Sequence, residues 1–278
     1  MGKASSKKIA DILRVSRRKV RIADRTASST PGCKNKEEAL ERTGKNLARI
    51  DDLQYRLGAE AQRSLLIVLQ GMDAAGKDGV IRKVMTAFNA QGCKVTSFKV
   101  PTPQEAAHDF LWRIHQAAPA RGEVAIFNRS HYEDVLVVRV HDIVPKRVWE
   151  RRYDRINQFE EHLHEHGTRV LKFFLHISRK EQRERLLARL DDPARNWKFS
   201  EADLVERVRW NDYRAAFEDA LVRCNTKQAP WYVIPSDHKW YRDLAISEIL
   251  CRTLENMDPE PPQVAIDVKR LRAKLART

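Results

Sequence analysis

Residues 64–79 read SLLIVLQGMDAAGKDG, an apolar run followed at once by a glycine-rich turn. The run at 64–70 is typical of a buried β-strand, and the spacing of apolar residues from Gly79 to Asn89 predicts a helix after the turn. A strand, a Gly-x-x-x-x-Gly-Lys turn and a helix form the context in which a P-loop binds phosphate. Backbone N–H groups, the helix N-terminus and the Lys77 cation would all face one anion. The segment therefore predicts a phosphate-binding loop.

Outward from this loop, apolar strands alternate with helical stretches. We expect further strands at 94–100, 123–127, 169–177 and 231–235, and helices at 37–61, 103–117, 145–167, 178–190, 200–225 and 239–256. This alternation predicts a five-stranded parallel sheet with helices on both faces, a three-layer α/β/α domain. We place this domain at 61–258, preceded by a basic N-terminal arm and a leading helix at 1–60 and followed by a basic C-terminal tail at 259–278.

The composition is that of a folded protein with basic ends. The chain has 278 residues, 42% of them hydrophobic, and a formal net charge of +14. Residues 1–25 hold nine Lys or Arg and two Asp, and residues 265–278 hold five Lys or Arg and one Asp. Such ends attract polyanions, including nucleic acid, acidic membrane surfaces and inorganic phosphate polymers, or they only improve solubility. A nucleic-acid-binding module built on these ends is one alternative, and it predicts that removing both ends abolishes binding.

Several other classes of protein are disfavoured. No apolar run approaches the roughly 18 residues of a membrane span, and the N-terminus lacks the apolar stretch of a signal peptide. The four cysteines include no Cys-x-x-Cys pair, which argues against a zinc site or a disulfide framework. We therefore expect a cytoplasmic protein without a membrane partner.

The P-loop carries two unusual carboxylates. A Ser or Thr normally follows the P-loop lysine and binds magnesium, whereas Asp78 follows Lys77 here and Asp73 lies inside the loop. A carboxylate beside phosphates is repulsive unless a divalent cation lies between them. We therefore predict Asp73 as a ligand of Mg²⁺, with Mn²⁺ as an alternative. Asp78 would support the site indirectly or place a negative charge at the helix N-terminus. The other loop residues expected to contact phosphate or nucleotide are Gly71, Ala74, Ala75, Gly76 and Gly79.

Two further segments supply candidate site residues. The third strand runs into Asn128 and Arg129, with Glu133 shortly after, at the strand end where P-loop proteins place polar groups beside the phosphates. Residues 179–214 are predicted to form a lid that closes over the phosphates. Arg185 and Arg189 share one face of its first helix, although ordinary surface salt bridges would also account for single arginines there.

Four motifs together resemble the second family of polyphosphate kinases. They are GMDAAGKDG at 71–79, FNRSHYEDVL at 127–136, NWKFSEADL at 196–204 and IPSDHKWYR at 234–242, and the resemblance extends from about residue 40 to 254. It implies a P-loop fold like that of thymidylate kinase and magnesium-dependent transfer of a terminal phosphoryl group between inorganic polyphosphate and a nucleotide. It also implies assembly as a homodimer or homotetramer.

Carried over by motif, the family's functional residues fall on Asp73, Lys77, Arg129, Arg189 and Lys198. Many members have Asp where this chain has Asn128, which leaves a second carboxylate ligand of the metal in question. The overall pattern resembles the subgroup that accepts nucleoside mono- and diphosphates, so we expect AMP and ADP, or the corresponding guanine nucleotides, as acceptors. An acceptor phosphate is already ionised near neutral pH, so no general base is required. The second enzyme hypothesis is an ATP-dependent P-loop kinase acting on a nucleotide or small metabolite.

Overall fold

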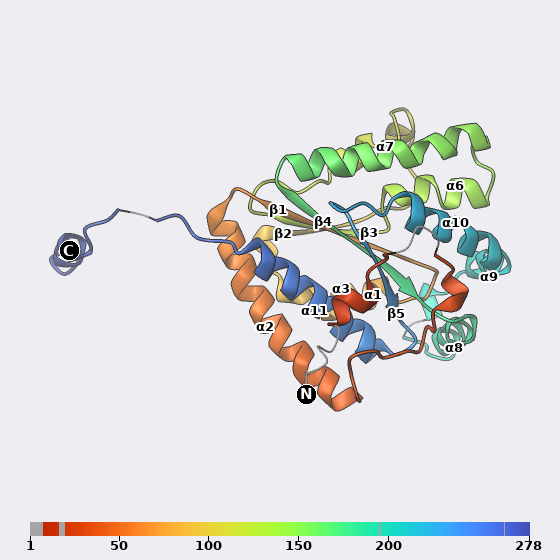
Figure 1. The fold of residues 1–278 in the computed structure, drawn as a ribbon, viewed down its shortest axis with the longest axis horizontal. Helices are drawn as coiled ribbons and strands as arrows, with labels where there is room; N and C mark the ends of the chain where they lie inside the picture. Colours follow the sequence, from red (N-terminus) through yellow and green to blue (C-terminus); the bar gives the residue numbers. More distant parts are fainter. Residues whose placement is uncertain (1–7, 17–19, 195, 264) are drawn as a thin grey trace, which may run out of the picture.

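The structure is a computed structural model that describes residues 8–16, 20–194, 196–263 and 265–278. Its centre is a parallel sheet in the order β2-β3-β1-β4-β5 (Figure 1). The strands are β1 (Ser64–Gly71), β2 (Cys93–Ser97), β3 (Val124–Asn128), β4 (Thr168–His176) and β5 (Trp231–Pro235). The predicted five-stranded parallel sheet is thus confirmed. Because β1 lies between β3 and β4, the P-loop that follows β1 is flanked by the carboxyl ends of both neighbours.

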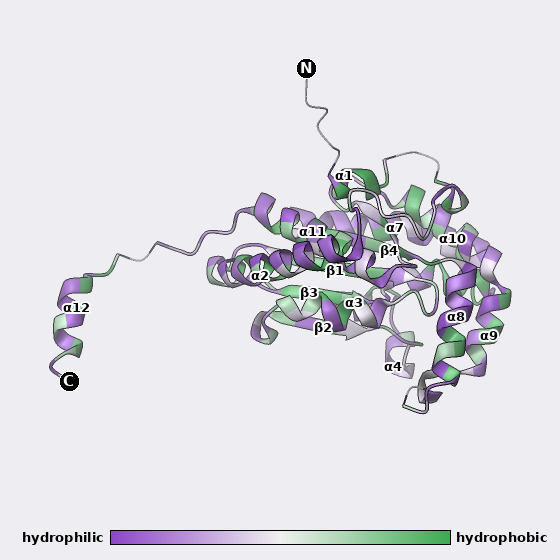
Figure 2. Cartoon of the chain, turned by 90° about the horizontal axis from the view of Figure 1, so that it is seen from below, coloured by the Kyte–Doolittle hydropathy of each residue, from purple (hydrophilic) through white to green (hydrophobic). Residues whose placement is uncertain are grey.

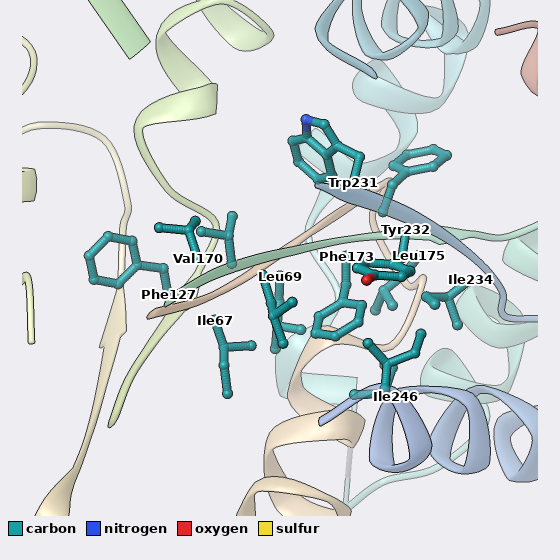
Figure 3. Packing of buried hydrophobic residues seen from close by; sticks show 14 of the residues in the cluster. Ile67, Leu69, Phe127, Val170, Phe173, Leu175, Trp231, Tyr232, Ile234 and Ile246 are labelled. Atoms are coloured by element: carbon teal, nitrogen blue, oxygen red, sulfur yellow. The ribbon is translucent and has the colours of Figure 1, made fainter. Parts of the chain in front are cut away.

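Helices cover both faces of the sheet, as in a three-layer α/β/α fold. One layer contains α2 (Lys36–Glu60), α3 (Lys77–Lys83) and α11 (Lys239–Met257), and the other contains α6 (Val137–Val140), α7 (Lys146–Glu165) and α10 (Trp210–Arg223) (Figure 1). The apolar side chains of β1 from Leu65 to Leu69 are fully buried between the layers. Figure 3 shows residues of β1, β3, β4 and β5 packed together, with Ile246 of α11 closing one side. Burial on both faces explains why the strands are continuous apolar runs.

Two predicted helices are interrupted. The stretch at 103–117 forms α4 (Pro103–Ala106) and α5 (Trp112–His115), because the Asp109 carboxylate accepts a hydrogen bond from the Leu111 N–H at 2.9 Å and forms a turn between them. The stretch at 200–225 forms α9 (Glu201–Val208) and α10, which meet at Arg209. Helix α10 buries apolar side chains against the sheet, whereas α9 buries none. The helix is interrupted where the chain returns to the core from the predicted lid, which begins with α8 (Arg179–Leu190).

The two ends of the chain differ in their packing. Residues of α1 (Ile9–Leu13) and the following segment are buried in the core, and the Val15 N–H donates to the Trp231 carbonyl at 2.9 Å. The described part of the basic N-terminal region is therefore packed onto the domain. In contrast, α12 (Val268–Leu275) has no buried residue and stands away from the body (Figures 1 and 2). Among the described residues, no helix is both long enough and apolar enough to span a membrane.

Candidate active site

The turn after β1 has the backbone of a phosphate-binding loop. Ala74 and Gly76 have φ values of +60° and +108°, and α3 begins directly afterwards at Lys77. The Lys77 ammonium group lies back over the loop, donating to the Gly71 carbonyl at 2.8 Å and to the Met72 carbonyl at 3.4 Å. Burial, with the nearby Arg129 cation, lowers the pKa of Lys77. The lysine is held by two carbonyls at the position where an anionic ligand would be a stronger partner.

The carboxyl end of β3 meets this loop through Arg129. Its backbone is left-handed, with φ of +61°, so the side chain turns back toward the neighbouring strand end. The guanidinium group lies 2.9 Å from the Asp73 carboxylate and 3.4 Å from the Glu133 carboxylate. Burial acts to lower the pKa of Arg129, but these two carboxylates outweigh it and raise the pKa. The structure thus brings Asp73 and Lys77 together with Arg129 and Glu133, although Asp73 and Arg129 are 56 residues apart in sequence.

Asp78 and Asn128 form a second contact between the same strand ends. The Asn128 amide donates to the Asp78 carboxylate at 3.0 Å, and it also lies 3.5 Å from the Ser97 hydroxyl at the end of β2. Asp78 is the second residue of α3, where a negative charge is favourable. An Asp in place of Asn128 would face Asp78 with a like charge, so this pair explains why an amide suits the position.

Arg185 and Gln182 of α8 hold the P-loop backbone from the lid side. Arg185 donates to the Ala74 and Ala75 carbonyls at 3.0 and 3.1 Å and also to the carbonyls of Ser236 and Asp237 after β5. The buried Gln182 side chain donates to the Asp73 carbonyl at 2.9 Å. Gln182 was not predicted from the sequence to belong to the site. Its place one helical turn before Arg185 could have indicated a shared face of α8.

Arg242 also contacts the loop and was not assigned a role from the sequence, although it ends the IPSDHKWYR motif. It is buried and paired with Asp243 at 2.7 Å. A methyl group added at Gly76 would lie 2.0 Å from its guanidinium nitrogen. Gly76 is therefore required both by its positive φ and by the close approach of this arginine.

Arg189 and Lys198, the predicted lid residues, are placed differently. Arg189 lies 3.9 Å from Asp203 of α9. Burial raises the pKa of Asp203, and the charge of Asp73 raises it further, which puts Asp203 within electrostatic range of the loop carboxylate. Arg189 thus pairs with a carboxylate of the predicted lid itself. Lys198 ends a short turn of 3₁₀-helix, Asn196–Lys198, and its side chain lies outside the described part of the structure.

A buried polar network supports the segment that follows Arg129. Lys172 of β4 and Glu160 of α7 are 0% and 1% exposed and form an ion pair at 2.5 Å. Lys172 also donates to the Tyr132 hydroxyl and to the Cys224 carbonyl, and Tyr132 donates to Glu160 at 2.8 Å. The network joins β4 and α7 to His131 and Tyr132, so it fixes the segment that follows Arg129.

The residues present suit a magnesium ion shared with substrate phosphates. In the described ranges, no group of three or more His, Cys, Asp or Glu side chains is arranged to hold a metal. Magnesium is usually bound by one or two carboxylates together with substrate phosphates and waters. Asp73 satisfies this requirement because its carboxylate lies at the P-loop beside Lys77 and Arg129. A metal would then depend on phosphate for most of its other ligands.

The parallel α/β fold, the P-loop and the arginine at the end of the neighbouring strand define a P-loop phosphotransferase. Residues 33–262 match the family model described as "Polyphosphate kinase 2 (PPK2)". The chain belongs to the polyphosphate kinase 2 family.

Individual relatives agree with this assignment. The chain is 52% identical to "AMP/ADP-polyphosphate phosphotransferase" of Meiothermus ruber over 82% of this chain and 85% of the relative. It is 45% identical to "ADP-polyphosphate phosphotransferase" of Rhodopseudomonas palustris over 84% and 85% of the two chains. The crystal structure of polyphosphate kinase 2 from Arthrobacter aurescens superposes with a TM-score of 0.95 at 41% identity, covering 98% of each chain. Because the match covers 98% of this chain, the aligned region includes most of residues 259–278.

Proposed function

We propose that this protein transfers the terminal phosphoryl group of inorganic polyphosphate to AMP and ADP, forming ADP and ATP. The proposal is carried by the Asp73–Arg129 pair beside Lys77. In this arrangement a P-loop carboxylate and two cations lie together at the carboxyl ends of two neighbouring strands. The family and the names of the relatives support this reaction over an ATP-dependent small-molecule kinase. The name of the Meiothermus relative supports acceptance of both mono- and diphosphates.

The geometry suits phosphoryl transfer without a general base. The attacking group is a phosphate oxygen of the acceptor nucleotide, which needs no deprotonation near neutral pH. The protein must hold two polyanions in line and cancel their repulsion. Lys77 and the loop N–H groups would bind the donor phosphates, while Arg129 would exchange its contact with Asp73 for a phosphate oxygen. A bound magnesium ion at Asp73 would neutralise charge on the phosphates.

Arg185, Gln182 and Arg242 act on the loop and not on the phosphates. Arg185 and Gln182 hold the carbonyls of Asp73, Ala74 and Ala75, so they fix the orientation of the peptide groups in this turn. Preorganised donors of this kind are worth more than donors that must reorient during the reaction. The lid helix α8 therefore couples the shape of the P-loop to the position of the lid.

Incubation with polyphosphate and Mg²⁺ tests the proposal, with AMP, ADP, GMP and GDP as separate acceptors and triphosphate formation as the readout. We expect ATP from both adenine nucleotides, loss of activity when the metal is chelated, and recovery with Mg²⁺ or Mn²⁺. Transfer that occurs only when ATP is the donor would overturn the proposal. We further propose a cytoplasmic location and assembly as a homodimer or homotetramer, with sedimentation equilibrium as the test of the latter.

A further inference from the structure

A segment near the N-terminus crosses the carboxyl ends of two strands beside the site. Residues 22–31, here called the strap, lie between α1 and α2 and are red in Figure 1. At the end of β4, the His176 imidazole donates from Nε2 to the Arg25 carbonyl at 2.8 Å. After β5, the Asp237 N–H donates to the Ala27 carbonyl at 3.1 Å. The backbone of the strap is therefore attached to both strand ends.

Asp237 connects the strap to the lid helix α8. Its carboxylate accepts a hydrogen bond from the Ser178 N–H at 2.8 Å, and Ser178 is the N-cap of α8. A negative charge at a helix N-terminus is also favourable. The Asp237 carbonyl accepts a second hydrogen bond, at 3.0 Å, from Arg185 two turns further along α8. One residue thus contacts the strap and two points on the lid helix.

The direction of α8 determines whether Arg185 reaches the P-loop. Arg185 lies about 10 Å along the helix axis from Ser178. A tilt of about 10° at the start of α8 would therefore move the Arg185 guanidinium group by about 2 Å. That displacement would break its hydrogen bonds of 3.0 and 3.1 Å with the Ala74 and Ala75 carbonyls. The contacts at the start of α8 therefore influence the shape of the P-loop.

We propose that Asp237 is a positioning residue for phosphoryl transfer, held in place by the strap and fixing the direction of the lid helix. Through α8 it keeps the peptide groups of the P-loop in the orientation that phosphate binding requires. His176 acts one step further away, because it holds the strap that in turn holds Asp237. The family model matches residues 33–262, so the strap precedes the matched region. Only the kinetic readout of this inference rests on the proposed function.

Hydrogen–deuterium exchange of the full chain without ligand tests the link between strap and lid. Asp237→Ala should raise the exchange rate of the peptide at 178–186 about tenfold, because the Ser178 N–H loses a charged acceptor. Asp237→Asn keeps an acceptor oxygen and should exchange like the wild type. His176→Leu should produce the same rise as Asp237→Ala, whereas His176→Gln keeps a donor and should not. Asp11→Ala is the matched control, because Asp11 pairs on the surface with Arg252 instead.

The kinetics of polyphosphate-dependent transfer supply the second readout. Asp237→Ala and His176→Leu should lower kcat at least about tenfold with KM nearly unchanged, because they disturb preorganisation and remove no substrate contact. Asp237→Asn and His176→Gln should retain most of the wild-type kcat.

Three results would overturn the proposal. They are unchanged exchange at 178–186 in either Asp237→Ala or His176→Leu, equal losses in Asp237→Asn and Asp237→Ala, and a rise in exchange spread evenly over the whole chain. The last result would indicate a general loss of stability without a specific effect on the lid. A wild type that transfers no phosphate from polyphosphate would refute the proposed function alone, since hydrogen exchange would still decide this inference.

Discussion

Replacing Lys172 by Met should destabilise the protein because it leaves a carboxylate buried without its partner. Burial alone would raise the pKa of Glu160, but Lys172 and His131 outweigh it and hold the pKa below its usual value. Removing one member of a buried ion pair costs about 3–5 kcal/mol. The Tyr132 hydroxyl and the Cys224 carbonyl lose a donor as well. A loss of this size should lower Tm by about 10 °C.

Equilibrium urea unfolding at pH 8 measures this loss, with Lys172→Met/Glu160→Gln as the matched variant. Removing the charge at both positions should cost less than the sum of the two single changes, because no unpaired ion remains. In Lys172→Met, burial should raise the pKa of Glu160, so the deficit should shrink as the pH falls and the carboxyl group binds a proton. Additive single effects, or a loss of less than about 1 kcal/mol, would refute the reasoning.

Three other changes test individual contacts. Gly76→Ala should abolish phosphoryl transfer and destabilise the fold by about 1–3 kcal/mol, because the added methyl group overpacks against Arg242. In contrast, Gly58→Ala within α2 should stabilise the fold by about 0.5–1 kcal/mol. Urea unfolding and turnover assays measure the effects of both variants. Gln182→Leu should lower kcat for polyphosphate-dependent transfer because the Asp73 carbonyl loses its donor, and unchanged kcat and KM would contradict that role. Burial raises the pKa values of Cys93 and Cys251 to about 11, so alkylation by iodoacetamide should be slow at pH 8 and its rate should keep rising with pH until the pH reaches that value.

The strands and the P-loop could be predicted because local patterns encode them. An apolar run of strand length followed by Gly71 to Lys77 constrains the backbone without reference to distant residues. The placement of Arg129 beside the P-loop could be predicted because the carboxyl ends of parallel strands lie at the same edge of the sheet. The order of the strands, in contrast, depends on pairings between distant segments that no local pattern specifies.

The contacts that shape the site were less visible in the sequence. Arg185 was recognised as lying on a lid helix face, but its contacts with the P-loop carbonyls depend on where α8 packs. Lys172 was predicted only as part of an apolar strand. A single lysine among buried residues needs a buried partner, and this requirement could have been recognised from the sequence. Glu160 could have been sought on the inner face of the preceding helix. The packing of the N-terminal region onto the domain was hidden by its high charge, because only a few apolar residues make the contact.

The most direct test of the account compares Lys77→Ala and Asp73→Ala with the wild type. Both side chains act on ligands and not on core packing, so the account predicts that transfer from polyphosphate to ADP falls by at least about 10²-fold. Thermal unfolding of the two variants should stay close to that of the wild type. Near-normal turnover in either variant with an intact fold would contradict the assignment of the P-loop as the site of phosphoryl transfer.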